Sequence, residues 1–248
     1  MLPFATLLLA FPAAHDAVRD RWLQVASGTA TAARLPSWTP FASLSGLDKW
    51  QMLHGPALAA STEGYVTPYA EEPIGALTLA GPRAATVEHV LPLSKVNGPL
   101  PGEAEDDPHG WIAVTRKMKL IRGELPLVLW DTGEGDTTRT PPCVETIGGE
   151  LHFVPPLKQR ARLARKWLYT RYQYMDVCDI SPKSAAQQRH MPDIVELMRA
   201  TPISPYERLV ADALQATTGW SNPLLHADEA VRDSFLCDPD WLAVASVA

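Results

Sequence analysis

The segment DPHGWIAVTRKMKLIRGELPL, residues 107–127, decides the fold because a strand candidate in it runs directly into a helix candidate. Trp111 to Val114 is apolar and rich in strand-forming residues. Arg116 to Ile121 follows as a short basic helix, and Gly123 closes it. The segment therefore predicts a strand and a helix with no loop between them.

A second strand candidate lies upstream in the sequence. Thr86 to Leu91 is prone to form a strand, and Pro92 ends it. Asn97 to Asp107 is rich in Pro, Gly and acidic residues, which predicts a loop between the two strands. The predicted order is therefore strand, loop, strand, helix.

Helical periodicity characterises much of the remaining chain. Apolar residues three or four positions apart in Leu157 to Met175 predict a long helix. Another helix is predicted to begin at Ser204, because Pro205 suits the first helical position and Glu207 completes a capping box. Further helices are predicted over His15 to Ala26 and Pro192 to Arg199, loops with short elements over Pro36 to Pro82, and a loop over Thr132 to Gly149. This order predicts an α+β fold with a helical N-terminal segment, a small antiparallel sheet and a helical C-terminal half.

The composition is that of a globular chain with a locally basic surface. At 248 residues and 46% hydrophobic content the chain can bury a sizeable core, and we expect one domain over residues 18–248. The net charge of −6 argues against a uniformly basic nucleic-acid-binding surface, since phosphate contacts need Lys and Arg. Residues 115–122 and 158–171 nevertheless hold ten of the 22 Lys and Arg residues. Any nucleic-acid surface must therefore be local.

The N-terminus leaves two interpretations open. Leu2 to Ala14 is apolar, too short to span a bilayer and about as long as the core of a signal peptide. Ala13, Ala14 and Ala17 could serve a signal peptidase, although no basic residue precedes the apolar run. We expect residues 1–17 to be a signal peptide, which would make the protein secreted or periplasmic, or else a buried first segment.

Cysteine usage gives little support to cysteine chemistry. Cys143, Cys178 and Cys237 allow at most one internal disulfide. No pair has zinc-site spacing, so a structural disulfide or buried thiols are expected rather than a catalytic cysteine.

The stretch VEHVLP, residues 87–92, is the part of the sequence best suited to chemistry. Phosphodiester hydrolysis needs an activated water, and a neutral imidazole such as that of His89 suits this task at neutral pH. A hard oxygen ligand such as Glu88 can hold Mg²⁺. Neighbouring residues of a strand point to opposite faces, so the pair alone also fits an ordinary surface carboxylate and a structural histidine.

Four blocks of sequence resemble the endonuclease I family, which comprises periplasmic and secreted non-specific nucleases of the ββα-metal (His-Me finger) type. Residues 87–92 resemble its arginine-glutamate-histidine-x-x-proline motif, and residues 107–127 its aspartate-leucine-histidine motif with the following helix. The resemblance extends over about residues 85–225. The matching positions in the last three blocks are Asp107, His109, Arg122, Gly123 and Pro126, then Arg160, Ala164, Arg165, Tyr169 and Tyr174, and finally Pro202, Ile203, Ser204, Tyr206 and Glu207 with Gly219, Asn222, Pro223 and Leu224.

The resemblance implies a role for each residue of the site. His89 would be the general base and Glu88 a ligand of Mg²⁺, Mn²⁺ or Ca²⁺ in a ββα-metal fold. Lys119 stands at the asparagine that supplies the family's second metal ligand, and lysine has no oxygen and would repel a cation. An oxygen of Asp107 or Asn97 would then have to replace that ligand, or Glu88 would pair with Lys119 instead of a metal. The other departures from the family pattern are Val87, Gly110, Glu124 and Trp220.

Two functions follow from the resemblance. The first is a metal-dependent endonuclease of low sequence specificity, a monomer that acts on DNA or RNA and spans no membrane. The second is a catalytically degenerate nuclease fold retained for binding or as a structural protein. Asp107 and His109 would be framework residues in either case. The predicted phosphate-backbone contacts are Lys117, Arg122, Arg162 and Arg165, although charged helix faces are commonly just solvated.

Overall fold

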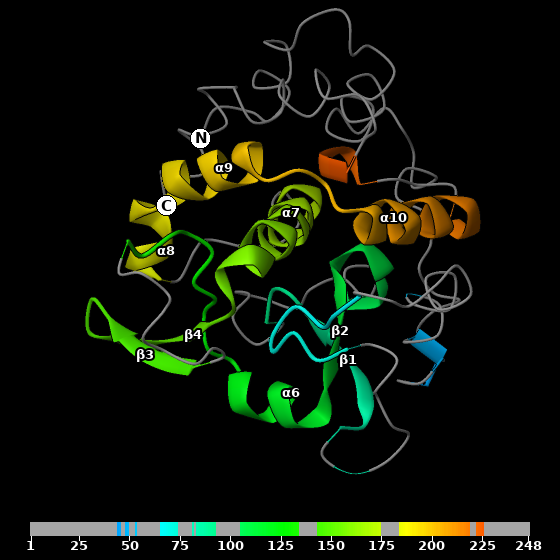
Figure 1. Cartoon of the computed structure of the whole chain (residues 1–248), viewed down its shortest axis with the longest axis horizontal. Helices are drawn as coiled ribbons and strands as arrows, with labels where there is room; N and C mark the ends of the chain where they lie inside the picture. The colour runs from blue at the N-terminus through cyan, green and yellow to red at the C-terminus, as the bar shows by residue number, and fades with distance from the viewer. Residues whose placement is uncertain are drawn as a thin grey trace, which may run out of the picture.

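Two small antiparallel sheets and several helices give the chain an α+β fold (Figure 1). The computed structural model describes residues 44–45, 48–49, 53, 65–73, 81, 83–92, 105–133, 143–174, 184–218 and 222–225. The elements are β1 (Ala85–His89), η4 (Pro108–Gly110), β2 (Trp111–Thr115), α6 (Arg116–Arg122), β3 (Cys143–Ile147), β4 (Glu150–Val154), α7 (Leu157–Tyr174), α8 (Ala185–Arg189), α9 (Met191–Ala200), α10 (Pro205–Thr218) and η5 (Pro223–Leu225). The predicted α+β class is confirmed.

Strands β1 and β2 form an antiparallel pair that leads straight into α6. His89 lies opposite Trp111 at one end of the pair, and Ala85 lies opposite Thr115 at the other. The Thr115 hydroxyl caps α6 by accepting a hydrogen bond from the backbone N–H of Met118 at 3.4 Å. The strand, strand and helix predicted for this part of the chain are therefore present, within two residues of the expected bounds.

The prediction of a loop over Thr132 to Gly149 is wrong in its second half. Residues 143–147 form β3, which pairs with β4 so that Ile147 lies opposite Glu150. Gly148 and Gly149 make the two-residue turn at φ values of 60° and 88°, a region that glycine enters without steric cost. Val144 and Leu151 are 40% and 55% exposed, so the hairpin does not show the strong apolar alternation of a half-buried strand.

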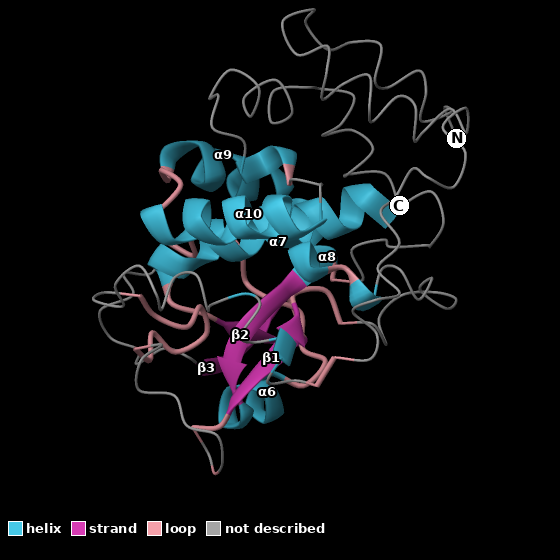
Figure 2. Cartoon of the chain, turned by 90° about the vertical axis from the view of Figure 1, so that its right-hand side faces the viewer, coloured by secondary structure: helices cyan, strands magenta, loops and turns pink. Residues whose placement is uncertain are grey.

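The helices α7, α9 and α10 form one layer above the strands, and α6 lies on the other side of them (Figure 2). Tyr206 and Val210 of α10 pack with Val87 of β1 and Trp111 of β2 in one buried cluster. The predicted capping box at the start of α10 is confirmed: Glu207 N donates to Ser204 Oγ at 3.2 Å, and Ser204 N donates to Glu207 Oε2 at 2.9 Å. This local signal thus positions the helix that covers β1 and β2.

Helix α7 is buried on all sides over residues 159–171, including its basic residues. Arg165 reaches Glu207 of α10 through two hydrogen bonds of 3.0 and 3.2 Å. Arg160 donates to the carbonyl oxygens of Pro155 and Trp130 at 3.0 and 2.7 Å. The basic residues of this helix therefore connect it to neighbouring segments instead of facing solvent.

Several expectations lie outside the described residues: the helix over His15 to Ala26, the segment 1–17, Asn97, and the side chains of all three cysteines. Among the described residues, no helix has the length and apolar composition needed to cross a membrane.

We predict that Glu207→Gln lowers the free energy of unfolding by about 3 kcal/mol at pH 7, because it leaves Arg165 buried without its carboxylate. Burial alone would raise the pKa of Glu207, but Arg165 and the Ser204 backbone N–H hold it below its ordinary value. A lowered carboxyl pKa stabilises the fold above the unfolded-state pKa, and this stabilisation is lost as pH falls through the folded-state pKa. Urea unfolding should therefore show that the difference in free energy of unfolding between wild type and Glu207→Gln shrinks below about pH 4. The same difference at all pH values would contradict the prediction.

Candidate functional site

His89 is the last residue of β1, half-buried and held by a backbone carbonyl. Its Nε2 lies 2.7 Å from the carbonyl oxygen of Glu105. A carbonyl oxygen only accepts hydrogen bonds, so Nε2 carries the proton and Nδ1 keeps its lone pair. The indole N–H of Trp111, which lies opposite His89, donates to the same oxygen at 2.9 Å. Within the described part of the chain Nδ1 has no hydrogen-bond partner, so its lone pair can accept a proton.

The surroundings of His89 keep the imidazole neutral. Burial lowers the pKa of His89 below its ordinary value of 6.5. The nearby cations Lys119 and Lys49 lower this pKa further, whereas the bond to the Glu105 carbonyl opposes the shift. A neutral imidazole is the form that acts as a general base, so His89 is in its basic form at pH 7.

Glu88 points to the opposite face of β1 from His89 and forms an internal ion pair. Its Oε1 accepts a hydrogen bond of 2.6 Å from Arg122 Nη1, and both side chains are buried. Arg122 also donates from Nη2 to the carbonyl oxygen of Val90 at 3.0 Å. Burial raises the pKa of Glu88, against the opposing effects of Arg122 and Lys119. The partner of Glu88 is thus Arg122, and the alternative pairing with Lys119 is wrong.

Lys119 is exposed on α6 and reaches back to β1. Its Nζ donates to the carbonyl oxygen of Val87 at 2.7 Å. The ammonium lies close enough to Glu88 and His89 to affect the pKa of both. The chain therefore places a fixed positive charge where the resemblance implies a metal ligand.

Positive charges surround the carboxylate that would hold the expected Mg²⁺, Mn²⁺ or Ca²⁺, although its Oε2 has no hydrogen-bond partner among the described residues. A cation beside Glu88 would face the positive charges of Arg122 and Lys119. Among the residues that the structure describes, no group of three His, Cys, Asp or Glu side chains could hold a metal ion. Both oxygens of Asp107 accept hydrogen bonds within the protein, Oδ1 from His109 N at 2.8 Å and Oδ2 from the Tyr169 hydroxyl at 2.8 Å.

Asp107 and His109 instead connect η4 to α7, as a framework role requires. The His109 ring packs on Tyr169 with 5.3 Å between ring centroids, and the His109 carbonyl accepts from Lys166 Nζ at 3.0 Å. Gly110 is one of the positions that depart from the family pattern. A Cβ there would lie 2.9 Å from the Thr170 hydroxyl, so the glycine allows η4 to approach α7 closely.

Only one of the four predicted phosphate contacts is on the surface. Lys117 is exposed on α6. Arg122, Arg162 and Arg165 are buried and donate to protein oxygens, so they do not belong to an exposed basic surface. The exposed cations of α6 are Arg116, Lys117 and Lys119. Together they form a short basic surface next to the site, the α6 basic surface.

Two contributors to the site left no recognisable signal in the sequence. Glu105 acts through its backbone carbonyl, which every residue type carries. Lys49 lies 4.4 Å above the Trp111 ring and forms an ion pair of 3.3 Å with Asp106, but it belongs to a stretch without periodicity.

Comparison with known proteins finds no matching family model and no matching curated sequence.

We predict that Lys119→Gln raises the pKa of His89, because it removes a nearby cation that disfavours the imidazolium form. NMR titration of the imidazole Cε1–H resonance measures this change directly. Lys117→Gln is the matched control, one that removes an exposed charge from the same helix, and should leave the titration unchanged. An identical midpoint in wild type and Lys119→Gln would show that the ammonium is not close to the ring.

Proposed function

We propose that the chain is an endonuclease I-like phosphodiesterase that cleaves DNA or RNA, with His89 as the general base in a ββα-type site. The observation that carries the proposal is the hydrogen bond from His89 Nε2 to the Glu105 carbonyl, since it leaves Nδ1 as a proton acceptor beside Lys119. The four blocks of sequence resemblance, in the family's order, add independent support.

In the proposed reaction, Nδ1 of His89 takes a proton from a water molecule as the water oxygen attacks phosphorus. The bond between phosphorus and the leaving ester oxygen breaks, and that oxygen takes a proton from solvent. The products are a phosphate monoester and an alcohol, and His89 returns its proton to solvent. The imidazole is a base only when neutral, so the lowered pKa of His89 keeps it competent below pH 6.5.

Lys119 would counter the negative charge that builds up on the phosphate. By the resemblance, Lys119 would stand at the position of the family's second metal ligand, and its ammonium is held at the Val87 carbonyl while Glu88 is already paired with Arg122. A preorganised positive charge at a reacting phosphate stabilises the transition state. We therefore propose a reaction that does not depend on Mg²⁺, in contrast to what the resemblance alone implies.

The α6 basic surface would bind the sugar-phosphate backbone. Arg116 and Lys117 are exposed at the start of α6, where they could meet phosphate oxygens. Contacts to phosphates position a nucleic acid without reading its sequence, so low sequence specificity is expected.

A second candidate function is a degenerate nuclease fold that binds nucleic acid without cutting it. The Glu88–Arg122 ion pair favours it, because the carboxylate that would hold a metal is already neutralised. Binding through the α6 basic surface is common to both candidates.

The test is cleavage of supercoiled plasmid and of single-stranded RNA, in EDTA and in Mg²⁺ or Mn²⁺. We expect EDTA-resistant cleavage by wild type and a loss of at least about 100-fold in His89→Ala, since general bases contribute rate factors of this order. His190→Ala, a histidine stacked on Trp130, is the matched control and should cut normally. If wild type is inert in every condition and Lys119→Asn cuts with Mg²⁺, the second candidate is correct.

We also predict that Lys117→Gln weakens duplex DNA binding and reduces the slope of log affinity against log salt concentration by about 0.9, the value for one lost phosphate contact. Fluorescence anisotropy with a labelled duplex in EDTA gives the slope. Arg199→Gln on α9 serves as the comparison and should leave the slope unchanged. Equal slopes for all three proteins would place the nucleic-acid contact elsewhere.

A further inference from the structure

Lys49 reaches the candidate site from a part of the chain that the resemblance over residues 85–225 does not cover. Asp48, Lys49 and Leu53 have helical conformation, and Ser45 caps this segment. Ser45 Oγ accepts a hydrogen bond from Asp48 N at 3.2 Å, and Asp48 Oδ2 accepts one from Ser45 N at 3.1 Å. These reciprocal bonds fix the backbone just before Lys49, so the direction in which its side chain leaves is set locally.

Lys49 and Leu53 dock this segment on Trp111 of β2. Residues four positions apart lie on the same face of a helix. Leu53 is 1% exposed and belongs to the buried cluster that contains Val87 and Trp111. The Lys49 ammonium lies over the Trp111 ring, 4.4 Å from its centroid, which is a favourable cation–π distance. One face of the segment thus holds the Trp111 ring in place.

The same ammonium forms an ion pair with the residue after Glu105. Lys49 Nζ lies 3.3 Å from Asp106 Oδ1, and the two side chains are only 17% and 13% exposed. The Glu105 carbonyl belongs to the peptide group that joins Glu105 to Asp106. It accepts hydrogen bonds from the Trp111 indole N–H at 2.9 Å and from His89 Nε2 at 2.7 Å. Lys49 therefore contacts the side chains on both sides of the oxygen that fixes the His89 tautomer.

We propose that Lys49 is a positioning residue, which holds the Glu105 carbonyl where it keeps the proton of His89 on Nε2. The inference rests on the proposed function, because it concerns the base of the proposed reaction. A partly buried ion pair is screened less by salt and water than an exposed one, so the pair with Asp106 restrains the peptide group effectively. Without Lys49, the Asp106 carboxylate would lose this partner and turn toward water, taking the Glu105 carbonyl with it.

The charge of Lys49 acts in the same direction as its contacts. Its ammonium lowers the pKa of His89, in addition to the larger effect of burial. Both the charge and the position of the carbonyl therefore leave Nδ1 as an unprotonated acceptor at neutral pH. The ammonium itself is engaged by Asp106 and the Trp111 ring, so Lys49 acts through His89 and not on the phosphate.

The test is the ratio of the two neutral tautomers of His89, read from long-range ¹H–¹⁵N correlation spectra of the full chain at pH 7. We expect Lys49→Gln to lower the ratio of the Nε2–H to the Nδ1–H form about fivefold, the contribution of one hydrogen bond. Asp106→Asn should lower it in the same direction, because it removes the other partner of the ion pair. It decides the test if Lys49→Gln folds poorly. An unchanged ratio in both variants would overturn the proposal.

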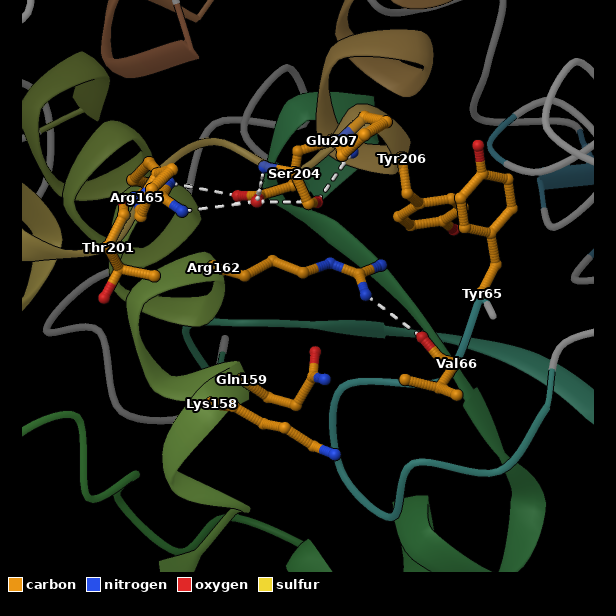
Figure 3. Close-up of a pocket in the computed structure, with 12 residues that line it drawn as sticks. Tyr65, Val66, Lys158, Gln159, Arg162, Arg165, Thr201, Ser204, Tyr206 and Glu207 are labelled. Carbon is orange, nitrogen blue, oxygen red and sulfur yellow. Dashed lines mark hydrogen bonds and ion pairs between the residues drawn. The ribbon is translucent and has the colours of Figure 1, made fainter. Parts of the chain in front are cut away.

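Lys158→Gln is the matched control. Lys158 also pairs with a carboxylate, that of Glu71 at 3.0 Å, but it lies on α7 beside a separate pocket between α7 and the start of α10 (Figure 3). Its substitution should leave the His89 tautomer unchanged. If Lys158→Gln shifts the ratio as much as Lys49→Gln does, the effect is a general one of lost ion pairs, and Lys49 is not a positioning residue.

The tautomer ratio is independent of activity, so this inference and the proposed function can fail separately. An inert wild type with a Lys49-dependent ratio would refute the proposed cleavage and leave the positioning role of Lys49 intact. If wild type cleaves nucleic acid, Lys49→Gln should lower kcat about fivefold and leave KM unchanged, since a residue that acts through the base affects only the chemical step. A raised KM with unchanged kcat would make Lys49 a phosphate contact and overturn the proposal.

Discussion

The antiparallel pairing of β1 with β2 is the constraint on which the candidate site depends. It sets His89 opposite Trp111, and the Glu105 carbonyl binds both side chains. Because α6 begins at the residue after β2, the helix turns back along β1 and brings Lys119 to the Val87 carbonyl. An imidazole, a carboxylate and an ammonium that are up to 31 positions apart in sequence therefore meet around one strand end.

Buried cations form a second constraint on the molecule. Arg122, Arg160 and Arg165 each connect their helix to another segment through hydrogen bonds to carboxylate or carbonyl oxygens. Removing the partner of a buried charge costs several kcal/mol, so these pairs must form for the fold to be stable. Arg162 differs from these three, because among the described residues its Nε has no hydrogen-bond partner.

Local signals in the sequence predicted the elements that form the site. The strand-prone runs before and after the acidic loop, the helix after Thr115 and the capping box of Ser204 and Glu207 all act over a few residues. The hairpin of β3 and β4 was missed although Gly148 and Gly149 mark its turn, because its exposed side chains obscured the alternation. Burial of the arginines depends on which helices surround α7, and a charge pattern carries no such information. The pairing of Glu88 with Arg122 instead of Lys119 also depends on tertiary packing, so the sequence alone could not predict it.

The proposed role of His89 as a general base requires an unprotonated Nδ1 at neutral pH. Long-range ¹H–¹⁵N correlation spectra of the folded protein distinguish the two neutral tautomers and the imidazolium form of each histidine, and His89→Gln assigns the signals. We expect that at pH 7 the ring of His89 is neutral with its proton on Nε2. A ring protonated on Nδ1, or on both nitrogens at this pH, would contradict it.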